Sequence, residues 1–330
     1  MSRLFSVPLL LLLAISSCRE PDSPQPPPEP IVNYQAYLAP VQEAVFKEDL
    51  FNGFLTSPSY WQKDRYAYRF PCFNPADPYE IAYLREDREV TGDCPMALFV
   101  FSFHTGKTLQ VSNNACYGLD WGSTGWLVYT GIDRKVWKVK ANGDSLTQLS
   151  FGSGFHNYPI WSPDGSRIVY QHEREIRLID ADGNFVKDAI HWFWPFEWLN
   201  DDEIMVGQSP LGGLAAYSWS SDSLAVLYRG GSFRYMSYFD QQSSNVFLDS
   251  DTSPHFSKYS LTTNKRDTLR RTYITYGYGL GDFAAQTNKA IIQLGRRDWK
   301  DSLANEIYFR AHLLMLDENG EELGIVQLPE

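Results

Sequence analysis

The sequence predicts an all-β protein, a six-bladed β-propeller of four-stranded antiparallel blades with a short, partly helical N-terminal extension. Two observations carry this prediction. An aromatic residue, a polar turn and a short apolar run recur in this order six times, about every 40 residues. Each of the six repeats then contains a second turn, four of them at a glycine. Four short strands in a repeat of this length are typical of propeller blades, which bury their faces only against neighbouring blades.

The repeats align by the aromatic residue that precedes the first turn, which we call the anchor. The turns contain Pro, Asp, Asn and Gly, which supply the fixed or positive φ that tight turns require. The apolar run after each turn, such as Ile168–Tyr170, fits a strand buried on both faces. The anchors are Phe73, Trp121, Trp161, Trp198, Phe239 and Phe283. The second turns fall at Gly106, Gly143, Gly183, Ser221–Asp222, Asn264–Lys265 and Gly320.

The third repeat carries a more specific resemblance. Its segment Tyr158–Gly165 reads Tyr-Pro-Ile-Trp-Ser-Pro-Asp-Gly, and Ile179–Gly183 reads Ile-Asp-Ala-Asp-Gly. This pattern resembles the WD40-like (PD40) repeat of TolB-type six-bladed propellers, and the resemblance covers residues 67–330, more weakly outside the third repeat. TolB carries an α/β domain before its propeller, which residues 31–66 are too few to form. The propellers of prolyl oligopeptidase relatives are also similar, but the Gly-x-Ser-x-Gly motif of their hydrolase domain is absent here.

The N-terminus predicts a bacterial lipoprotein. Residues 1–17 read as a signal peptide, because the apolar core Leu4–Ile15 is too short to span a bilayer of about 30 Å as a helix. The tetrapeptide ending at Cys18 resembles a lipobox, which makes Cys18 the lipidated first mature residue. The alternative is an ordinary cleaved signal in which Cys18 has no role. By the same resemblance Arg19 disfavours retention in the inner membrane, so we expect an outer-membrane lipoprotein that faces the periplasm or the cell surface.

Two short regions separate the signal peptide from the propeller at 67–330. Residues 18–30 contain the lipidated cysteine and a proline-rich tether, which has no apolar side chains other than proline to bury in a core. Residues 31–66 form the N-terminal extension, in which Pro40–Phe46 reads as a short amphipathic helix. We expect this extension to pack on the propeller or to help seal the junction between blades one and six.

Net charge and cysteine content limit the kinds of partner and the cellular compartment that the sequence allows. The formal net charge of −11 argues against nucleic acid and against electrostatic adhesion to anionic lipid, which leaves the N-terminal lipid as the only membrane contact. In the propeller, Cys72 and Cys116 are expected just before innermost strands, and Cys94 in a loop on the same rim. A Cys94–Cys116 disulfide is favoured in an oxidising periplasm, because that loop leans toward the next blade. The alternative is three unpaired buried thiols.

Candidate binding residues cluster in the stretch just before each anchor, which we call the leading segment. Aromatic rings around a concave rim can stack on sugars or take up apolar peptide side chains. The alternative for any single ring is a structural wedge between two blades, and for each histidine a hydrogen-bonded structural role. The candidates in the leading segments are Tyr117, His156, Tyr158, His191, Trp192, Trp194, Tyr235 and Tyr276.

Two long connections are expected in neighbouring blades, at Arg85–Cys94 in blade one and Gly295–Ser302 in blade six. Long loops on a rigid scaffold often carry binding residues. Within the second, Arg296, Arg297 and Trp299 form a basic and aromatic cluster suited to a carboxylate or a sugar. The alternative is a solvated charged loop.

No catalytic, metal-binding or cofactor-binding motif stands out. The six histidines lack metal-ligand spacing, and neither a phosphate-binding loop nor a dinucleotide fingerprint is present. The leading hypothesis is therefore a non-catalytic envelope lipoprotein, without cofactor or metal, that binds a protein, peptide or glycan through its rim. The alternative is an enzyme acting on polysaccharide, a lyase or a glycosidase, with its site on the propeller face.

Overall fold

The computed structural model describes residues 32–40, 65–87, 89–90, 94, 96–191, 193–208, 213–229, 233–250, 255–271, 276–301 and 306–329. These residues belong to one compact unit. Several predicted features lie outside the described residues: the expected signal peptide, Cys18, the expected tether, Trp192 and nearly all of the helix expected at Pro40–Phe46. Within the described ranges, no helix has the length and apolar character needed to cross a membrane.

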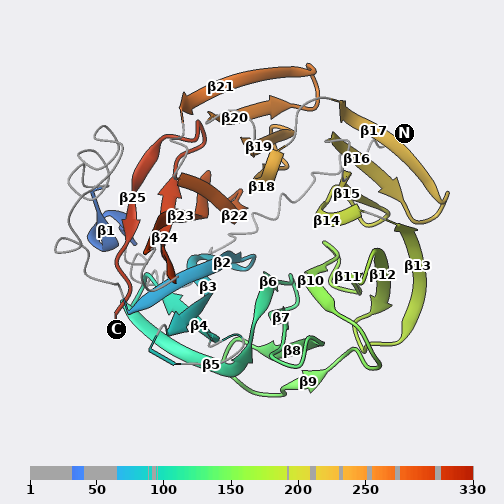
Figure 1. Cartoon of the computed structure of the whole chain (residues 1–330), viewed down its shortest axis with the longest axis horizontal. Helices are drawn as coiled ribbons and strands as arrows, with labels where there is room; N and C mark the ends of the chain where they lie inside the picture. The colour runs from blue at the N-terminus through green and yellow to red at the C-terminus, as the bar shows by residue number, and fades with distance from the viewer. Residues whose placement is uncertain are drawn as a thin grey trace, which may run out of the picture. The chain divides into compact units, whose positions relative to one another are not determined.

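Six antiparallel sheets succeed one another around a ring, which confirms the predicted six-bladed propeller (Figure 1). Blade one contains β2 (Tyr66–Asn74), β3 (Asp77–Asp87), β4 (Met96–Ser102) and β5 (Lys107–Ala115). Blade two contains β6 (Tyr117–Trp121), β7 (Trp126–Thr130), β8 (Val136–Lys140) and β9 (Thr147–Gln148). Blade three contains β10 (His156–Trp161), β11 (Arg167–His172), β12 (Glu175–Asp180) and β13 (Phe185–His191).

The second half of the ring repeats this meander. Blade four contains β14 (Phe193–Trp198), β15 (Glu203–Gln208), β16 (Gly213–Ser218) and β17 (Ser223–Arg229). Blade five contains β18 (Phe233–Asp240), β19 (Asn245–Ser250), β20 (His255–Ser260) and β21 (Lys265–Arg271). Blade six contains β22 (Tyr276–Ala284), β23 (Lys289–Asp301), β24 (Glu306–Leu316) and β25 (Glu322–Val326).

The core lies between blades rather than within them. The apolar runs predicted to be buried on both faces are buried, as in Ile168–Tyr170 of β11. Leu84 of blade one packs in one cluster with Trp121 and Leu127 of blade two. Full burial of one large apolar side chain contributes about 1.5–3 kcal/mol, so stability depends on each pair of neighbouring blades.

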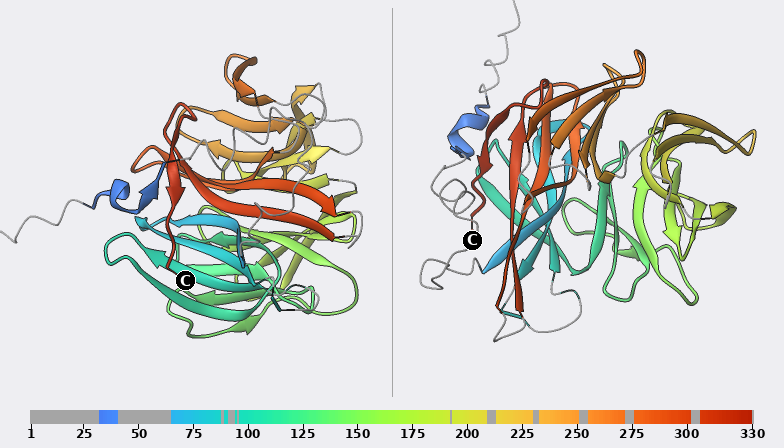
Figure 2. Two further views of the ribbon diagram at one scale, coloured as in Figure 1. Left: turned by 60° about the vertical axis from the view of Figure 1, so that its left-hand side comes forward. Right: turned by 45° about the horizontal axis from the view of Figure 1, so that its top comes forward.

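Blades one and six meet directly where the ring closes, and residues 32–40 of the N-terminal extension add to that junction. Strand β1 (Leu38–Ala39) pairs with β25 as a fifth strand of blade six, with Leu38 opposite Val326. The 3-10 helix η1 (Tyr34–Tyr37) lies against blade one, where Tyr34 stacks on Tyr79 at 4.8 Å between ring centroids. Figure 2 shows η1 and β1 beside β25. This short segment therefore contacts both blades at the junction where the extension was expected to act.

Two details of the sequence prediction were wrong. Cys72 lies inside β2 as a buried thiol, not before it, because the innermost strand already begins at Tyr66. The long connection expected at Gly295–Ser302 is mostly strand, since β23 continues to Asp301 and pairs with β24 through Arg297 and Phe309. Blade six thus has a long hairpin in place of the expected loop.

Candidate functional site

The leading segments form the first residues of the innermost strands, except for His191, which was expected there but ends the outer strand β13 of blade three. Each innermost strand then contains a break in its pairing register. Such β-bulges re-aim side chains and often lie near binding sites. In blades one to three the residue three positions before the anchor has a positive φ, with 50° at Phe70, 57° at Gly118 and 53° at Tyr158. This conformation is unusual for bulky residues, so the surrounding packing must hold it.

Phe70 and Tyr158 meet across the intervening blade. Their ring centroids lie 6.3 Å apart, although they belong to blades one and three. The glycine at the equivalent position of blade two makes this possible, because a Cβ on Gly118 would come within 2.7 Å of the Tyr158 Cα. Both rings are half-buried. The predicted candidate Tyr158 is thus one half of an aromatic pair formed by three consecutive blades.

A second aromatic group surrounds Arg134, in the turn between β7 and β8. Its guanidinium carbon lies 4.6 Å from the ring centroid of Tyr117 and 5.7 Å from that of Phe155. Phe155 and its loop neighbour Phe151 are 54% and 69% exposed, and Trp194 at the start of β14 is 43% exposed. We call Tyr117, Arg134, Phe151, Phe155 and Trp194 the aromatic rim. Trp194 belongs to the set by its place near the start of β14, the innermost strand of blade four.

The loop that carries Phe151 and Phe155 is fastened at two points. The Lys135 ammonium donates a hydrogen bond to the Gly154 carbonyl at 2.8 Å. The Phe155 amide donates to the Glu173 carboxylate at 3.1 Å. These bonds tie the loop to the turn between β7 and β8 on one side and to the turn between β11 and β12 on the other, so the exposed rings extend from a fixed backbone.

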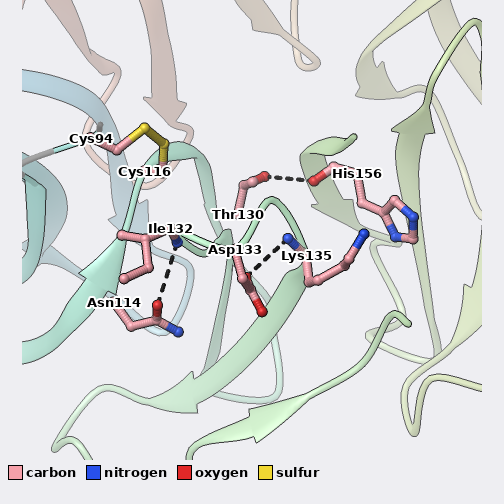
Figure 3. The surroundings of a disulfide bond; sticks show 8 residues. All are labelled: Cys94, Asn114, Cys116, Thr130, Ile132, Asp133, Lys135 and His156. Atoms are coloured by element: carbon pink, nitrogen blue, oxygen red, sulfur yellow. Dashed lines mark hydrogen bonds between the residues drawn. A yellow bond between two sulfur atoms is a disulfide. The ribbon is translucent and has the colours of Figure 1, made fainter. Parts of the chain in front are cut away.

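A disulfide joins Cys94 to Cys116, with 5.0 Å between their Cα atoms (Figure 3). This is the pair that the sequence analysis favoured. It links the connection between β3 and β4 of blade one to the residue before Tyr117 in blade two. The remaining described cysteine, Cys72, is a buried thiol whose pKa is raised by burial, which makes it a poor nucleophile.

His156 lies in the core and not on the ligand-binding rim where the sequence analysis placed it. The residue is fully buried, stacks on Tyr170 at 5.3 Å and meets the edge of His172 at 4.7 Å. Burial lowers the pKa of His156 to about 4, so the ring is neutral at physiological pH. Its Nε2 lies 3.2 Å from the Ser153 carbonyl oxygen, and its own carbonyl accepts a hydrogen bond from Thr130 (Figure 3). Its role here is to pack blade three.

The other predicted candidates are placed only by their backbones. His191, Tyr235 and Tyr276 lie in β13, β18 and β22, and Arg296, Arg297 and Trp299 lie in β23. Trp192 is outside the described residues. Sequence reasoning missed Phe151, Phe155 and Arg134, because the leading segment was taken to begin at His156. The pattern Phe-Gly-Ser-Gly-Phe before it is the signal that identifies this loop.

Three carboxylates, also missed, occupy the position just before the anchor in alternate blades: Asp120, Glu197 and Asp282. The Asp120 carboxylate accepts a hydrogen bond from the Trp161 amide of blade three at 2.7 Å. Asp282 accepts one from the Phe73 amide of blade one, also at 2.7 Å. Glu197 accepts from the amide of the next residue in its own strand. At least two of these carboxylates therefore bind neighbouring innermost strands together.

Burial shifts the acidity of all three carboxylates. It raises the pKa of Asp120 to about 7 and that of Asp282 to about 6, and it raises the pKa of Glu197 well above its ordinary value. The charges of Asp120 and Asp282 raise the pKa of Glu197 further, so the three groups influence one another around the axis of the ring. Across the described ranges, no group of three or more His, Cys, Asp or Glu is arranged to hold a metal ion.

The fold and the rim define this protein as a six-bladed β-propeller with aromatic side chains on one face. Its described architecture is similar to that of TolB propellers. A protein assigned as TolB from Agrobacterium tumefaciens superposes with a TM-score of 0.55 at 13% identity, over 72% of this chain and 92% of the other. TolB from Acinetobacter baumannii superposes with a TM-score of 0.56 at 12% identity, over 74% and 75% of the two chains.

The likeness extends beyond TolB. A chain of a nidogen/laminin complex superposes with a TM-score of 0.52 at 10% identity, over 80% of this chain and 93% of the other. At such identities the likeness concerns the fold alone. No protein-family model and no curated protein matches the sequence.

Proposed function

We propose that this protein is a lipid-anchored envelope protein whose propeller face binds a protein, peptide or glycan partner without catalysis. The observation that carries the proposal is the aromatic rim. Monomeric proteins seldom leave several large aromatic rings exposed on one face unless that face meets a partner. The five residues come from three consecutive blades and two of them share one cation, Arg134.

The rim offers chemistry for two kinds of ligand. Exposed rings such as Phe155 and Trp194 can stack on the apolar face of a sugar or receive an aliphatic peptide side chain. Arg134 adds donors for a carboxylate or a carbonyl. The hydrogen bonds of Lys135 and Glu173 limit the entropy lost on binding, because the loop is already ordered.

Replacement of the rim rings is expected to weaken binding. We expect Phe155→Ala and Trp194→Ala each to lower the affinity by about tenfold, since an aromatic contact contributes about 1.5 kcal/mol. A glycan array and pull-down from envelope extracts identify the ligand, whose affinity for each variant is then measured by calorimetry. Leu109→Ala is the control, because Leu109 is also exposed, at 48%, but lies on the outer strand β5. Unchanged affinity in both rim variants, with an intact fold, contradicts the proposal.

One observation favours the second candidate, an enzyme that acts on polysaccharide. Asp120 and Asp282 have pKa values raised toward neutrality, as general acids of glycosidases do. Their carboxylates are engaged by backbone amides, which supports a structural role instead. Incubation of the purified protein with uronate and neutral glycans decides between the two: we expect no products, and turnover that Asp120→Asn abolishes establishes the enzyme.

We propose that Cys18 carries a covalently attached lipid, because it ends the sequence that resembles a lipobox. We expect labelled palmitate to be incorporated into the wild-type precursor expressed in a bacterial host, and the label to be lost in Cys18→Ser. Ser23→Thr, downstream of the lipobox, is the control for the general effect of altering this segment. The cross-blade disulfide supports an oxidising compartment outside the cytoplasm. A precursor that is processed but never labelled argues for an ordinary secretory signal.

A further inference from the structure

The outer hairpin turns of most blades pack closely on the preceding blade. A Cβ on Gly143 of blade two would lie 3.5 Å from the Val111 carbonyl oxygen of β5. A Cβ on Gly183 of blade three would come within 2.6 Å of the Leu149 carbonyl oxygen, just after β9. The turn of blade six meets β21 and that of blade one meets η1 in the same manner. At Gly106, Gly183 and Gly320 the missing Cβ thus permits this close approach, whereas at Gly143 the contact is an ordinary van der Waals one.

Blades four and five lack this glycine, and their junctions differ. In blade four the turn residue is Asp222, with a φ of 53°. Lys187 of β13 lies 3.4 Å from the Asp222 carboxylate and donates to the Trp219 carbonyl at 3.3 Å, so an ion pair occupies that junction. In blade five the turn residue is Asn264, with a φ of 56°. There an open pocket remains between the turn and β17.

The pocket combines apolar and aromatic walls with one cation. Tyr228 and Tyr259 meet edge to face at 4.6 Å, and the Tyr259 hydroxyl donates to the Leu227 carbonyl at 3.1 Å. Arg266 supplies the charge, and no carboxylate of the described residues lies within ion-pair distance of it. An arginine in this setting suits an anionic oxygen of a ligand. The lining residues are Val226, Leu227, Tyr228, Tyr259, Asn264 and Arg266.

Beside this pocket runs an edge strand that lacks the usual protection. Strand β17 is the outermost of blade four (Figure 1), and its one charged residue is Arg229 at the end of the strand, so Ser223–Tyr228 carry no charge. Leu224 and Val226 are 41% and 48% exposed. Edge strands are normally blocked by charge, shortness or cover, because their free backbone groups pair readily with another strand.

The other five blades show such blocks. Strand β25 is covered by β1, and β9 has only two residues. Strands β13 and β21 carry charged residues within their length, and the turn at Gly143 packs on β5. Blade six shows that strand addition occurs in this protein, since β1 adds to its outer edge as an extra antiparallel strand. The β17 edge is therefore the one suited to receive a strand from outside.

We propose that the β17 edge and the adjacent pocket bind an extended peptide segment of a partner protein, which adds as a strand to blade four and places an acidic side chain on Arg266. Main-chain hydrogen bonds along Ser223–Val226 give the affinity in this mode of recognition, because the Leu227 carbonyl already accepts from Tyr259, and the pocket gives the specificity. Val226 contributes both to the strand edge and to the pocket, because it lies in β17 and lines the pocket. The site is on the perimeter of the propeller and does not depend on the function of the aromatic rim.

The test uses a blocked seven-residue peptide of alternating valine and threonine with one central glutamate, and its glutamine and lysine counterparts. We expect the full chain to bind the glutamate peptide at least tenfold more tightly than the glutamine peptide. Arg266→Glu is expected to reverse the preference toward lysine. Val226→Lys is expected to weaken all three, whereas Val186→Lys on β13, where Val186 is 49% exposed, leaves binding unchanged.

Hydrogen exchange locates the bound peptide, with slower exchange expected at Ser223–Val226. If Val226→Lys unfolds the chain, Leu224→Lys replaces it. Equal affinity for the three peptides, or binding unaffected by Arg266→Glu in a folded protein, overturns the proposal. Self-association in sedimentation that Val226→Lys abolishes also overturns it, since a second copy of this chain then occupies the edge.

Discussion

Gly118→Ala is expected to lower the free energy of unfolding by about 3 kcal/mol or more. Two costs add at this position. Its φ of 57° disfavours any residue with a Cβ by about 1–2 kcal/mol. The new Cβ would also meet the backbone of Tyr158 at 2.7 Å, where no side-chain movement gives relief. Urea denaturation of the wild type and the variant measures the difference.

A matched control separates these two costs. Gly125 has a φ of 81°, but a Cβ added to it would meet nothing within 4 Å, so Gly125→Ala carries the conformational cost alone. We expect it to destabilise by about 1 kcal/mol. Equal effects of the two substitutions would show that Gly118 is not needed for the close approach of Tyr158. Ligand affinity of the folded fraction provides a second readout, because the Phe70–Tyr158 pair lies beside the aromatic rim.

The thermal midpoint is expected to fall as pH rises from 5 to 8. The folded-state pKa values of Asp120, Glu197 and Asp282 are raised above their unfolded values, so the folded protein binds more protons over this interval. By linkage, their contribution is fully present below the unfolded pKa near 4 and is lost as pH rises through the folded pKa. His156 opposes this trend below about pH 6.5, because its lowered pKa makes the folded protein bind fewer protons there, but it is one group against three. Each pKa unit corresponds to about 1.4 kcal/mol, so we expect a net decrease of about 5 °C or more.

Asparagine variants identify the groups responsible. Asp282→Asn keeps an oxygen for the Phe73 amide but cannot ionise, so we expect it to reduce the slope of the thermal midpoint between pH 5 and 8. Asp180→Asn is the control, because hydrogen bonds from Asn184 lower the pKa of Asp180 and place its titration below this interval. A slope that Asp282→Asn and Asp120→Asn both leave unchanged would exclude these carboxylates as its source.

The architecture could be predicted from the sequence, because a propeller repeats one sequence pattern in every blade. Trp161 and its five counterparts each lie at the end of an innermost strand or one residue before it. That regularity predicts the number of blades without knowledge of any contact. The extent of a strand was harder to predict. Strand β23 runs through Arg296 and Arg297, where charge suggested a loop, because pairing with β24 satisfies its backbone regardless of side-chain polarity.

The site was less accessible to prediction, since it depends on contacts between blades. His156 was expected on the rim, but the register of β10 directs its ring into the core. Asp120 and Asp282 resemble ordinary turn carboxylates in a sequence rich in Asp. Their common position before the anchor in alternate repeats was readable, yet its meaning required the amides of Trp161 and Phe73 in the following blades.

The pairing of β1 with β25 has a consequence for the order of folding. Leu38 and Val326 lie about 290 residues apart, so this contact carries a high loop-closure entropy. During synthesis the first described strand has no partner until the last described strand is complete. Blades one to five have all their own strands before that point, whereas the closing contact can form only at the end. The ring is therefore expected to close last, and an interrupted chain exposes a free strand edge in blade six.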